Sequence, residues 1–116
     1  MYAFEIPGLR FSMPAGGAVA RHRFVSIADD AAIQATASTQ VVGVSTNEVT
    51  AAELEKNERV VEIADGIVIV EAAGAIASGA GVAADANGMA VTATTNAIGV
   101  ALTAATGAGQ LISIKL

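Results

Sequence analysis

The chain has 116 residues, a formal net charge of −5 and no cysteine. Its length fits one small domain, and the absence of cysteine excludes disulfide bridges and thiolate metal sites. Hydrophobic residues make up 53% of the chain, but 27 of them are alanine and only 3% of all residues are aromatic. The apolar area available for a core is therefore small, and we expect contacts with other subunits or partners to supply part of the stability.

The charge is distributed unevenly, because residues 24–116 contain ten acidic and three basic residues. Such a body does not attract nucleic acid by electrostatics, and it suits a partner that has basic patches. No basic segment followed by an apolar run opens the chain, so no signal peptide is expected. Residues 86–114 carry no charge. A membrane helix there is the weaker interpretation, because a stretch rich in Thr, Val and Gly favours strands.

Residues 1–16 predict an extended N-terminal arm, and residues 17–116 predict a single β domain. Three of the four aromatic residues, Tyr2, Phe4 and Phe11, lie in the arm beside Ile6. Two prolines and three glycines between residues 7 and 17 oppose a regular helix.

An imperfect internal repeat organises the rest of the chain. Residues 28–45 align without gaps on residues 84–101, and GAVA at 17–20 resembles GAIA at 74–77, shifted by one residue. Each copy predicts a strand, a turn, a strand, a short link and another strand. We expect repeat halves at approximately 17–71 and 72–116, and residues 1–16 resemble neither copy. The predicted fold class is all-β, a small β-barrel or sandwich built from two imperfect strand repeats with one short helix.

Local signals predict the turns and the helix. Asn87-Gly88 predicts a type I′ hairpin turn, and Asp65-Gly66 predicts a turn between strands at 60–63 and 67–71. The last strand, LISIKL at 111–116, places Ile112, Ile114 and Leu116 on one face. A capping box at Thr50 and Glu53 predicts about two helical turns, inserted where the second copy has a shorter link.

Several patterns resemble sites of chemistry but lack the required context. Gly79-x-Gly81-x-x-Ala84 has no following helix and no later acid for a ribose, so a glycine-rich turn is favoured over dinucleotide binding. Asp85-x-Asn87-Gly88 lacks the other ligands of a calcium loop. His22 is the only histidine, and no nucleophile has a recognisable setting near it. The acidic residues Asp29, Asp30, Glu53, Glu55, Glu58 and Glu62 are interpreted as solvated faces and turns. We therefore expect no enzyme activity, no catalytic residues, no cofactor and no metal.

Two functional classes remain besides an enzyme. The first is a structural protein that binds a large assembly through protein contacts, with the aromatic arm as its anchor. The alternative is a small β-module for ligand or carrier function in the cytoplasm. Carrier domains display a lysine at a hairpin tip, whereas Lys56 lies in the charged helical segment and Lys115 at the C-terminus.

Three long segments resemble the phage capsid cement proteins, also called head decoration proteins. These are FEIPGLRFSMPAGGAVARHRFV (4–25), VVEIADGIVIVEAAGAIASGAGVAADANG (60–88) and AIGVALTAATGAGQLISIKL (97–116). The markers are a GVS or GVA element at the end of each repeat half, an ADG element followed by an aliphatic strand, and a terminal I-x-I-K-L. The insertion at 50–59 departs from the shorter link expected of the family.

The resemblance implies a structural virion protein that decorates a phage capsid on its outer surface, after synthesis in the host cytoplasm. Its partners would be the major capsid protein, whose neighbouring subunits it clamps and stabilises, and further copies of itself. By analogy with the lambda head protein D, we expect a homotrimer. We expect no partner among nucleic acids or membranes. The hypothetical capsid contacts are Tyr2, Phe4, Ile6, Arg10 and Phe11, with Arg10 meeting an acidic patch.

Overall fold

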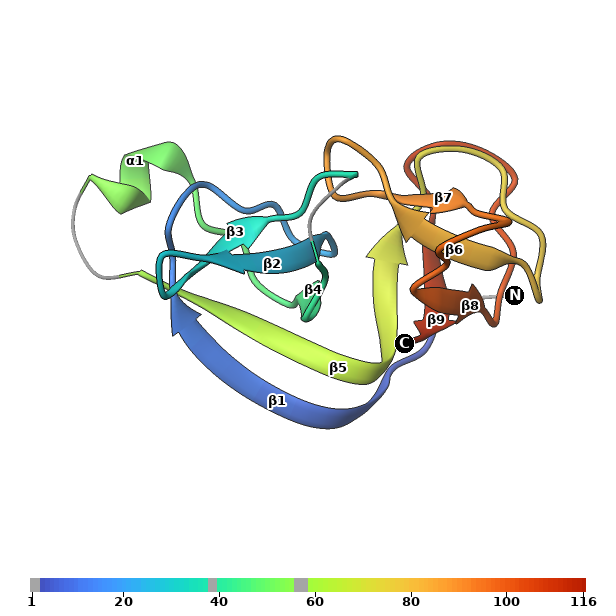
Figure 1. The fold of residues 1–116 in the computed structure, drawn as a ribbon, viewed down its shortest axis with the longest axis horizontal. Helices are drawn as coiled ribbons and strands as arrows, with labels where there is room; N and C mark the ends of the chain where they lie inside the picture. The colour runs from blue at the N-terminus through green and yellow to red at the C-terminus, as the bar shows by residue number, and fades with distance from the viewer. Residues whose placement is uncertain (1–2, 38–39, 56–58) are drawn as a thin grey trace.

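The computed structural model describes residues 3–37, 40–55 and 59–116. Within these residues the chain forms one curled antiparallel sheet of nine strands with a single short helix, which confirms the all-β prediction (Figure 1). The strands follow the order β3-β2-β4-β5-β9-β8-β6-β7, and β1 pairs with β5. The elements are β1 (Ile6–Pro14), β2 (Phe24–Ala28), β3 (Ala31–Gln34), β4 (Gly43–Ser45), α1 (Ala51–Leu54), β5 (Val60–Glu71), β6 (Gly81–Ala84), β7 (Ala90–Thr92), β8 (Gly99–Ala101) and β9 (Leu111–Lys115).

The molecule is elongated and has two lobes that share strand β5. The N-terminal lobe consists of β1–β4, α1 and residues 60–65 of β5, and the C-terminal lobe consists of residues 67–71 of β5 with β6–β9. Figure 1 shows the two lobes side by side, with β1 and β5 running beneath the N-terminal lobe. The principal extents are 40 × 25 × 23 Å. A single strand therefore contributes backbone pairing to both lobes.

The two lobes repeat the same ladder registers. Phe24 pairs with Val44 and Val44 with Ala64 in the N-terminal lobe, while Gly81 pairs with Val100 and Val100 with Lys115 in the C-terminal lobe. The isolated bridge between Ala15 and Ala32 likewise corresponds to the bridge between Ala72 and Ala90. The predicted strand order within each copy is thus present in the sheet.

The repeat extends further towards the N-terminus than the sequence indicated. The bridges equate Ala15, directly after β1, with Ala72, directly after β5. Strand β1 is therefore the counterpart of the second half of β5, and the first half of β5 is the counterpart of β9. The two copies of the repeat therefore meet inside β5, near Gly66. Residues 9–14, which were expected to belong to the arm, are part of the first copy. Side-chain identity within these strands is low, which hid the relation.

The type I′ turn lies at a different hairpin from the predicted one. Asp29 and Asp30, with φ of 52° and 63°, form the two-residue connection between β2 and β3, as this turn type requires. At the predicted position only Gly88 has a positive φ, of 73°. The connection between β6 and β7 spans residues 85–89, because the Asp85 carboxylate accepts hydrogen bonds from the backbone nitrogens of Asn87 and Met89, at 2.8 and 2.9 Å. The prediction of a type I′ turn at Asn87-Gly88 is wrong.

Asp65-Gly66 is a bend within one strand and not the predicted hairpin turn. Strand β5 continues through it from Val60 to Glu71. Gly66 has a φ of 111°, and a Cβ atom there would lie 2.6 Å from the Gly8 nitrogen. Opposite the bend, the β1–β5 register shifts between Pro7 and Leu9, which is the behaviour of a β-bulge. The glycine allows the strand to bend from one lobe into the other.

The capping box at Thr50 and Glu53 is confirmed on both sides, since each side chain accepts from the other residue's backbone nitrogen. Helix α1 spans Ala51–Leu54, one turn where about two were predicted. Lys56 and Glu58 of the predicted helix lie outside the described residues. Within the described part of the chain, no helix is long and apolar enough to cross a bilayer, and residues 86–114 contribute to β7, β8 and β9.

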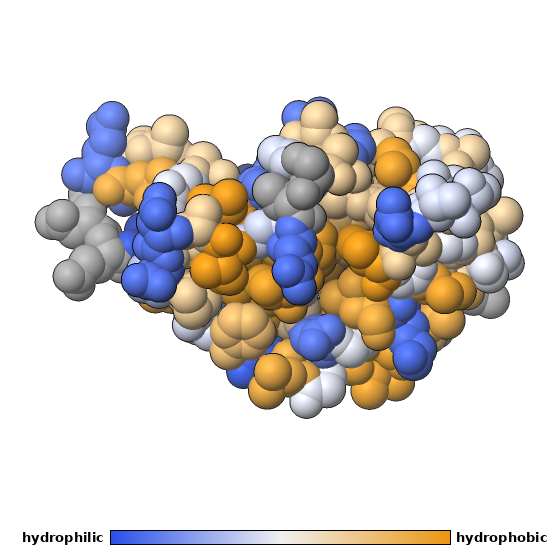
Figure 2. Space-filling view, in the orientation of Figure 1, coloured by the Kyte–Doolittle hydropathy of each residue, from blue (hydrophilic) through white to orange (hydrophobic). Residues whose placement is uncertain are grey.

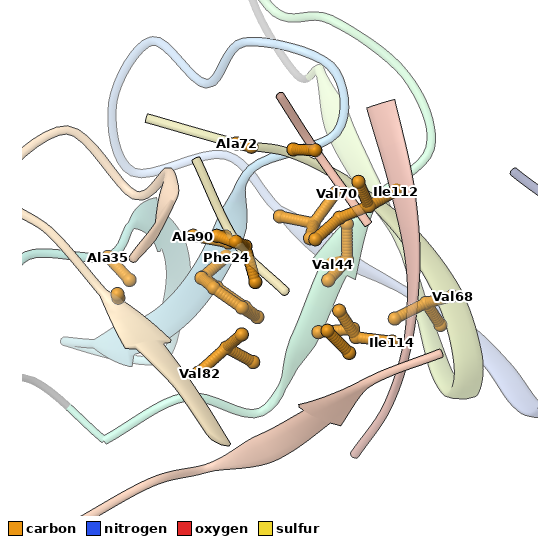
Figure 3. Packing of buried hydrophobic residues seen from close by; sticks show 14 of the residues in the cluster. Phe24, Ala35, Val44, Val68, Val70, Ala72, Val82, Ala90, Ile112 and Ile114 are labelled. Atoms are coloured by element: carbon orange, nitrogen blue, oxygen red, sulfur yellow. The ribbon is translucent and has the colours of Figure 1, made fainter. Parts of the chain in front are cut away.

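Two apolar clusters fill the lobes. The N-terminal cluster contains Val19, Val25, Ala32, Val49, Val61 and Ile63. The larger cluster fills the C-terminal lobe around Val70, Val82, Ile112 and Ile114, and it also includes Phe24, Val44 and Ala64 from the N-terminal lobe (Figure 3). Ile112 and Ile114 are fully buried, as the predicted face of the last strand requires. The N-terminal lobe therefore supplies part of the core of the C-terminal lobe.

A Gly43→Ala substitution tests the close packing of β4 on β5. A Cβ atom at Gly43 would lie 2.5 Å from Ile63 Cγ2 and 2.6 Å from the Ala64 carbonyl oxygen. Because the backbone oxygen cannot move independently, we expect the free energy of unfolding in urea to fall by about 1–3 kcal/mol. The control is Gly17→Ala, whose Cβ atom meets nothing within 4 Å. Equal urea midpoints for the two variants would contradict the packing described.

Candidate interaction surface

The structure places the predicted contact residues that it describes in two different environments. Phe4 and Ile6 are exposed, at 38% and 63% of their surfaces. Phe11 is half-buried and packs against the N-terminal cluster, so its ring supports the core of the lobe. Tyr2 lies outside the described residues. The predicted aromatic anchor is thus split between an outward and an inward part.

Leu9 is an exposed apolar residue that the sequence analysis did not select. Its surface is 58% exposed, second only to Ile6 among the large apolar residues described. Ile6 pairs with Ile67 and Leu9 with Asp65. Because these partners are two positions apart on β5, the bulge brings Ile6 and Leu9 to the same side of the ladder. No sequence signal marked this bulge, since it depends on pairing with β5.

Arg10 follows Leu9 in β1 and forms an ion pair with Glu5, 2.6 Å between Arg10 Nη2 and Glu5 Oε1. The Arg10 side chain is 56% exposed. An exposed pair of this kind contributes little to stability, so the guanidinium is available to exchange Glu5 for a carboxylate of a partner. Figure 2 shows hydrophobic residues alternating with hydrophilic ones along the lower rim, which in Figure 1 is formed by β1 and β5.

The segment before β1 is attached to the last strand. The Phe4 backbone nitrogen donates to Ser113 Oγ, which in turn donates to the Phe4 carbonyl oxygen. Ser113 is fully buried although it lies on the outward side of β9. These bonds hold Phe4 over the outward side of the C-terminal lobe, next to Ile6. We call the exposed residues Phe4, Ile6, Leu9 and Arg10 the β1 surface.

A polar junction connects the two lobes. Arg23 forms an ion pair with Glu71 at 3.3 Å, and its Nη1 donates to the Asn87 carbonyl oxygen at 3.0 Å. The His22 nitrogen donates to the Ser45 carbonyl oxygen, and the Glu71 nitrogen donates to the His22 carbonyl oxygen. These bonds tie the segment before β2 to both lobes. His22 is therefore a structural residue of the junction.

Burial lowers the pKa of the His22 imidazole below 6.5, and the neighbouring Arg21 charge lowers it further, against a hydrogen bond with the Ile69 backbone that raises it. The folded state therefore favours the neutral ring. His22 has a left-handed φ of 61°, a conformation that asparagine and histidine adopt more readily than most residues.

The other residues considered for chemistry have structural roles. The Asp85 carboxylate is occupied by the turn, and strand β6 occupies Gly81–Ala84 where a dinucleotide fingerprint needs a helix. Glu53 caps α1, and the Thr50 backbone hydrogen bond lowers the pKa of its carboxyl. Among the described residues, no group of three His, Cys, Asp or Glu side chains is placed to hold a metal ion.

Two surface hollows have no catalytic constellation among the residues described. A hollow of about 380 Å³ between the lobes is lined by Ala37, Gln40, Val41, Ala83, Ala84, Asn96 and Ile98, and none of these side chains is ionisable. A second hollow, of about 300 Å³, is lined by Arg23, Glu48, Gln34 and five small or aliphatic residues. The exposed apolar groups of the β1 surface are the better candidate for function.

A family model for the phage cement protein matches residues 5–116. The chain belongs to the phage cement protein family. Its fold is also that of a solved structure, "The crystal structure of head fiber gp8.5 N base in bacteriophage phi29", with a TM-score of 0.73 and 20% sequence identity over 93% of this chain and 92% of that chain. No curated protein matches the chain. This cement protein is thus a structural phage protein associated with the capsid, as the resemblance of its sequence predicted.

The pH dependence of stability tests the buried environment of His22. Because the folded state lowers the His22 pKa, the unfolded chain binds the proton more readily, and stability falls as pH drops through 6.5. The loss ends below the folded pKa. We expect the urea midpoint of the wild type to fall between about pH 7.5 and pH 5.5, above the range in which carboxylates titrate.

The matched variant is His22→Asn, which tolerates the positive φ. Its urea midpoint should change less over the same pH interval, because asparagine does not titrate. Parallel curves for wild type and variant would show that His22 does not control this pH dependence.

Proposed function

We propose that this cement protein decorates the outer surface of an assembled phage head and stabilises it by clamping neighbouring subunits of the major capsid protein. Membership of the cement protein family supports the role. The proposed mode of binding rests on Ile6 and Leu9, which are the two most exposed large apolar residues described. Burial of such side chains in a partner is favourable in proportion to their apolar area.

The β1 surface combines apolar and charged contacts. Phe4, Ile6 and Leu9 supply the apolar area, and Arg10 meets an acidic group of the capsid in place of Glu5. Strand β1 is also long, since eight of its nine residues pair with β5. A contact made from a strand held in a sheet costs less ordering entropy than one made from a free arm. Tyr2 would extend the contact from the N-terminal end.

A homotrimer would present three such surfaces at once. Each contact can then be weak, because binding of one subunit raises the effective concentration of the next. The closed oligomers of identical chains are symmetric, which matches the repeated environment of an icosahedral shell.

An Ile6→Asp variant tests the β1 surface. Placing a charge at a buried apolar contact should weaken binding to expanded heads assembled without this protein by about tenfold or more. The control is Ile27→Asp on β2, which changes an apolar residue that is 40% exposed and lies outside the β1 surface. Binding can be measured by co-sedimentation with heads, after both variants have been checked for wild-type urea midpoints. Equal occupancy by Ile6→Asp and Ile27→Asp would rule out Ile6 as an anchor.

The solution mass tests the trimer. We expect sedimentation equilibrium of the purified protein to give three times the chain mass of 11.5 kDa at micromolar concentrations. A monomer at every concentration would limit trimer formation to the capsid surface.

A further inference from the structure

The internal repeat gives the two lobes the same row of paired residues on their outward sides. In the N-terminal lobe the row runs Phe24–Val44–Ala64–Arg10 across β2, β4, β5 and β1. In the C-terminal lobe the corresponding row runs Gly81–Val100–Lys115–Ile67 across β6, β8, β9 and β5. Each residue of the first row has its counterpart at the same register of the second.

The first three residues of the row have different environments in the two lobes. Phe24, Val44 and Ala64 are 0%, 1% and 0% exposed, because they pack into the cluster of the C-terminal lobe (Figure 3). In the second row Val100 is 44% exposed and Lys115 is exposed. The fold thus buries this surface against protein in one lobe and leaves it open in the other.

The open row continues into the β1 surface. Ile67, half-buried, pairs with Lys115 on β9 and with Ile6 on β1. Val100, Lys115, Ile67 and Ile6 therefore form one line across four adjacent strands, which we call the outward row. Exposed apolar side chains that gather on one surface, here Val100 and Ile6, are typical of an interaction site.

We propose that the outward row is the part of this cement protein that docks on a capsid subunit, and that the docked segment presents an apolar ridge with a carboxylate opposite Lys115. The proposal rests on the function proposed above and names the surface and its partner chemistry. The partner's carboxylate is inferred from Lys115, because no carboxylate among the described residues forms an ion pair with it. In a body rich in acidic residues, this free cation selects a partner of opposite charge.

A second copy of the chain fits the outward row less well. Contact between two outward rows across a two-fold axis would bring the two Lys115 ammonium groups together, and like charges at an interface are unfavourable. A head-to-tail contact would repeat the packing between the lobes, and it needs an open core in the N-terminal lobe. That core is closed by Val49, which is 2% exposed, and by Leu54 of α1.

The experiment compares Val100→Asp with Val60→Asp. The two valines are 44% and 47% exposed, and both lie on strands, but Val60 is seven residues from Ile67 along β5, or about 23 Å. Binding is measured to expanded heads assembled without this protein. We expect Val100→Asp to raise the dissociation constant about tenfold or more and Val60→Asp to change it less than about twofold. The solution mass of Val100→Asp should equal that of the wild type.

A second variant, Lys115→Gln, tests the charge contact and keeps an exposed polar side chain. At about 50 mM salt this variant should bind several-fold more weakly than the wild type, and the difference should shrink at about 300 mM because salt screens the ion pair. Lys115→Arg should restore most of the binding. A salt-independent loss, or no loss, would overturn the role of Lys115.

The outcomes separate the surface from the function. If the wild type does not bind heads, the proposed function fails. If the wild type binds and Val100→Asp binds like Val60→Asp, the outward row is not the docking site. If Val100→Asp changes the solution mass, the row is a contact between copies, which also overturns the proposal. Urea midpoints of the variants show whether a loss of binding reflects unfolding. If Val100→Asp is unfolded, the test of the outward row rests on Lys115→Gln alone.

Discussion

The structure depends on the burial of one lobe's outward side in the core of the other. Phe24, with Val44 and Ala64, fills the space between β5, β6 and β9 that the small residues of the C-terminal lobe leave open. An alanine-rich chain has few large side chains to fill a core, and Phe24 of the N-terminal lobe adds a large apolar side chain to the core of the C-terminal lobe. The polar junction of Arg23 with Glu71 and Asn87 lies beside this contact and fixes the lobes relative to each other.

Local patterns in the sequence were sufficient where neighbouring residues determine the structure. The capping box of Thr50 and Glu53 and the alternation in LISIKL depend on residues a few positions apart, and both are present as predicted. The repeat of small residues also showed that similar strands occur twice. The capping residues of a helix and the alternation of side chains along a strand can be predicted without knowing which distant segments pack against them.

The remaining features depend on pairing between distant segments. The Asp65-Gly66 pair is typical of a turn, but β1 pairs with residues of β5 before and after it, and this pairing keeps β5 continuous. The Asp29-Asp30 hairpin shows that strand pairing can impose a left-handed conformation on two residues other than glycine. For the candidate surface, the aromatic composition of residues 2–11 indicated a region in which the structure exposes Phe4 and Ile6. Ile6 and Phe11 lie on the same side of the β1–β5 ladder, but this side faces the N-terminal cluster at Phe11 and solvent at Ile6, because β5 bends at Gly66 between the two lobes. The cement protein family, by contrast, was recognisable from the order of short motifs along the whole chain.

The shared strand also determines how the molecule bears tension. Strand β1 and the first half of β5 run along the long axis of the molecule (Figure 1) and are paired antiparallel over most of their length. Their hydrogen bonds lie perpendicular to the strands. A pull that stretches the molecule along this axis loads the ladder in shear, so the bonds resist together and do not open one after another. This resistance to stretching suits the proposed role as a clamp between neighbouring capsid subunits.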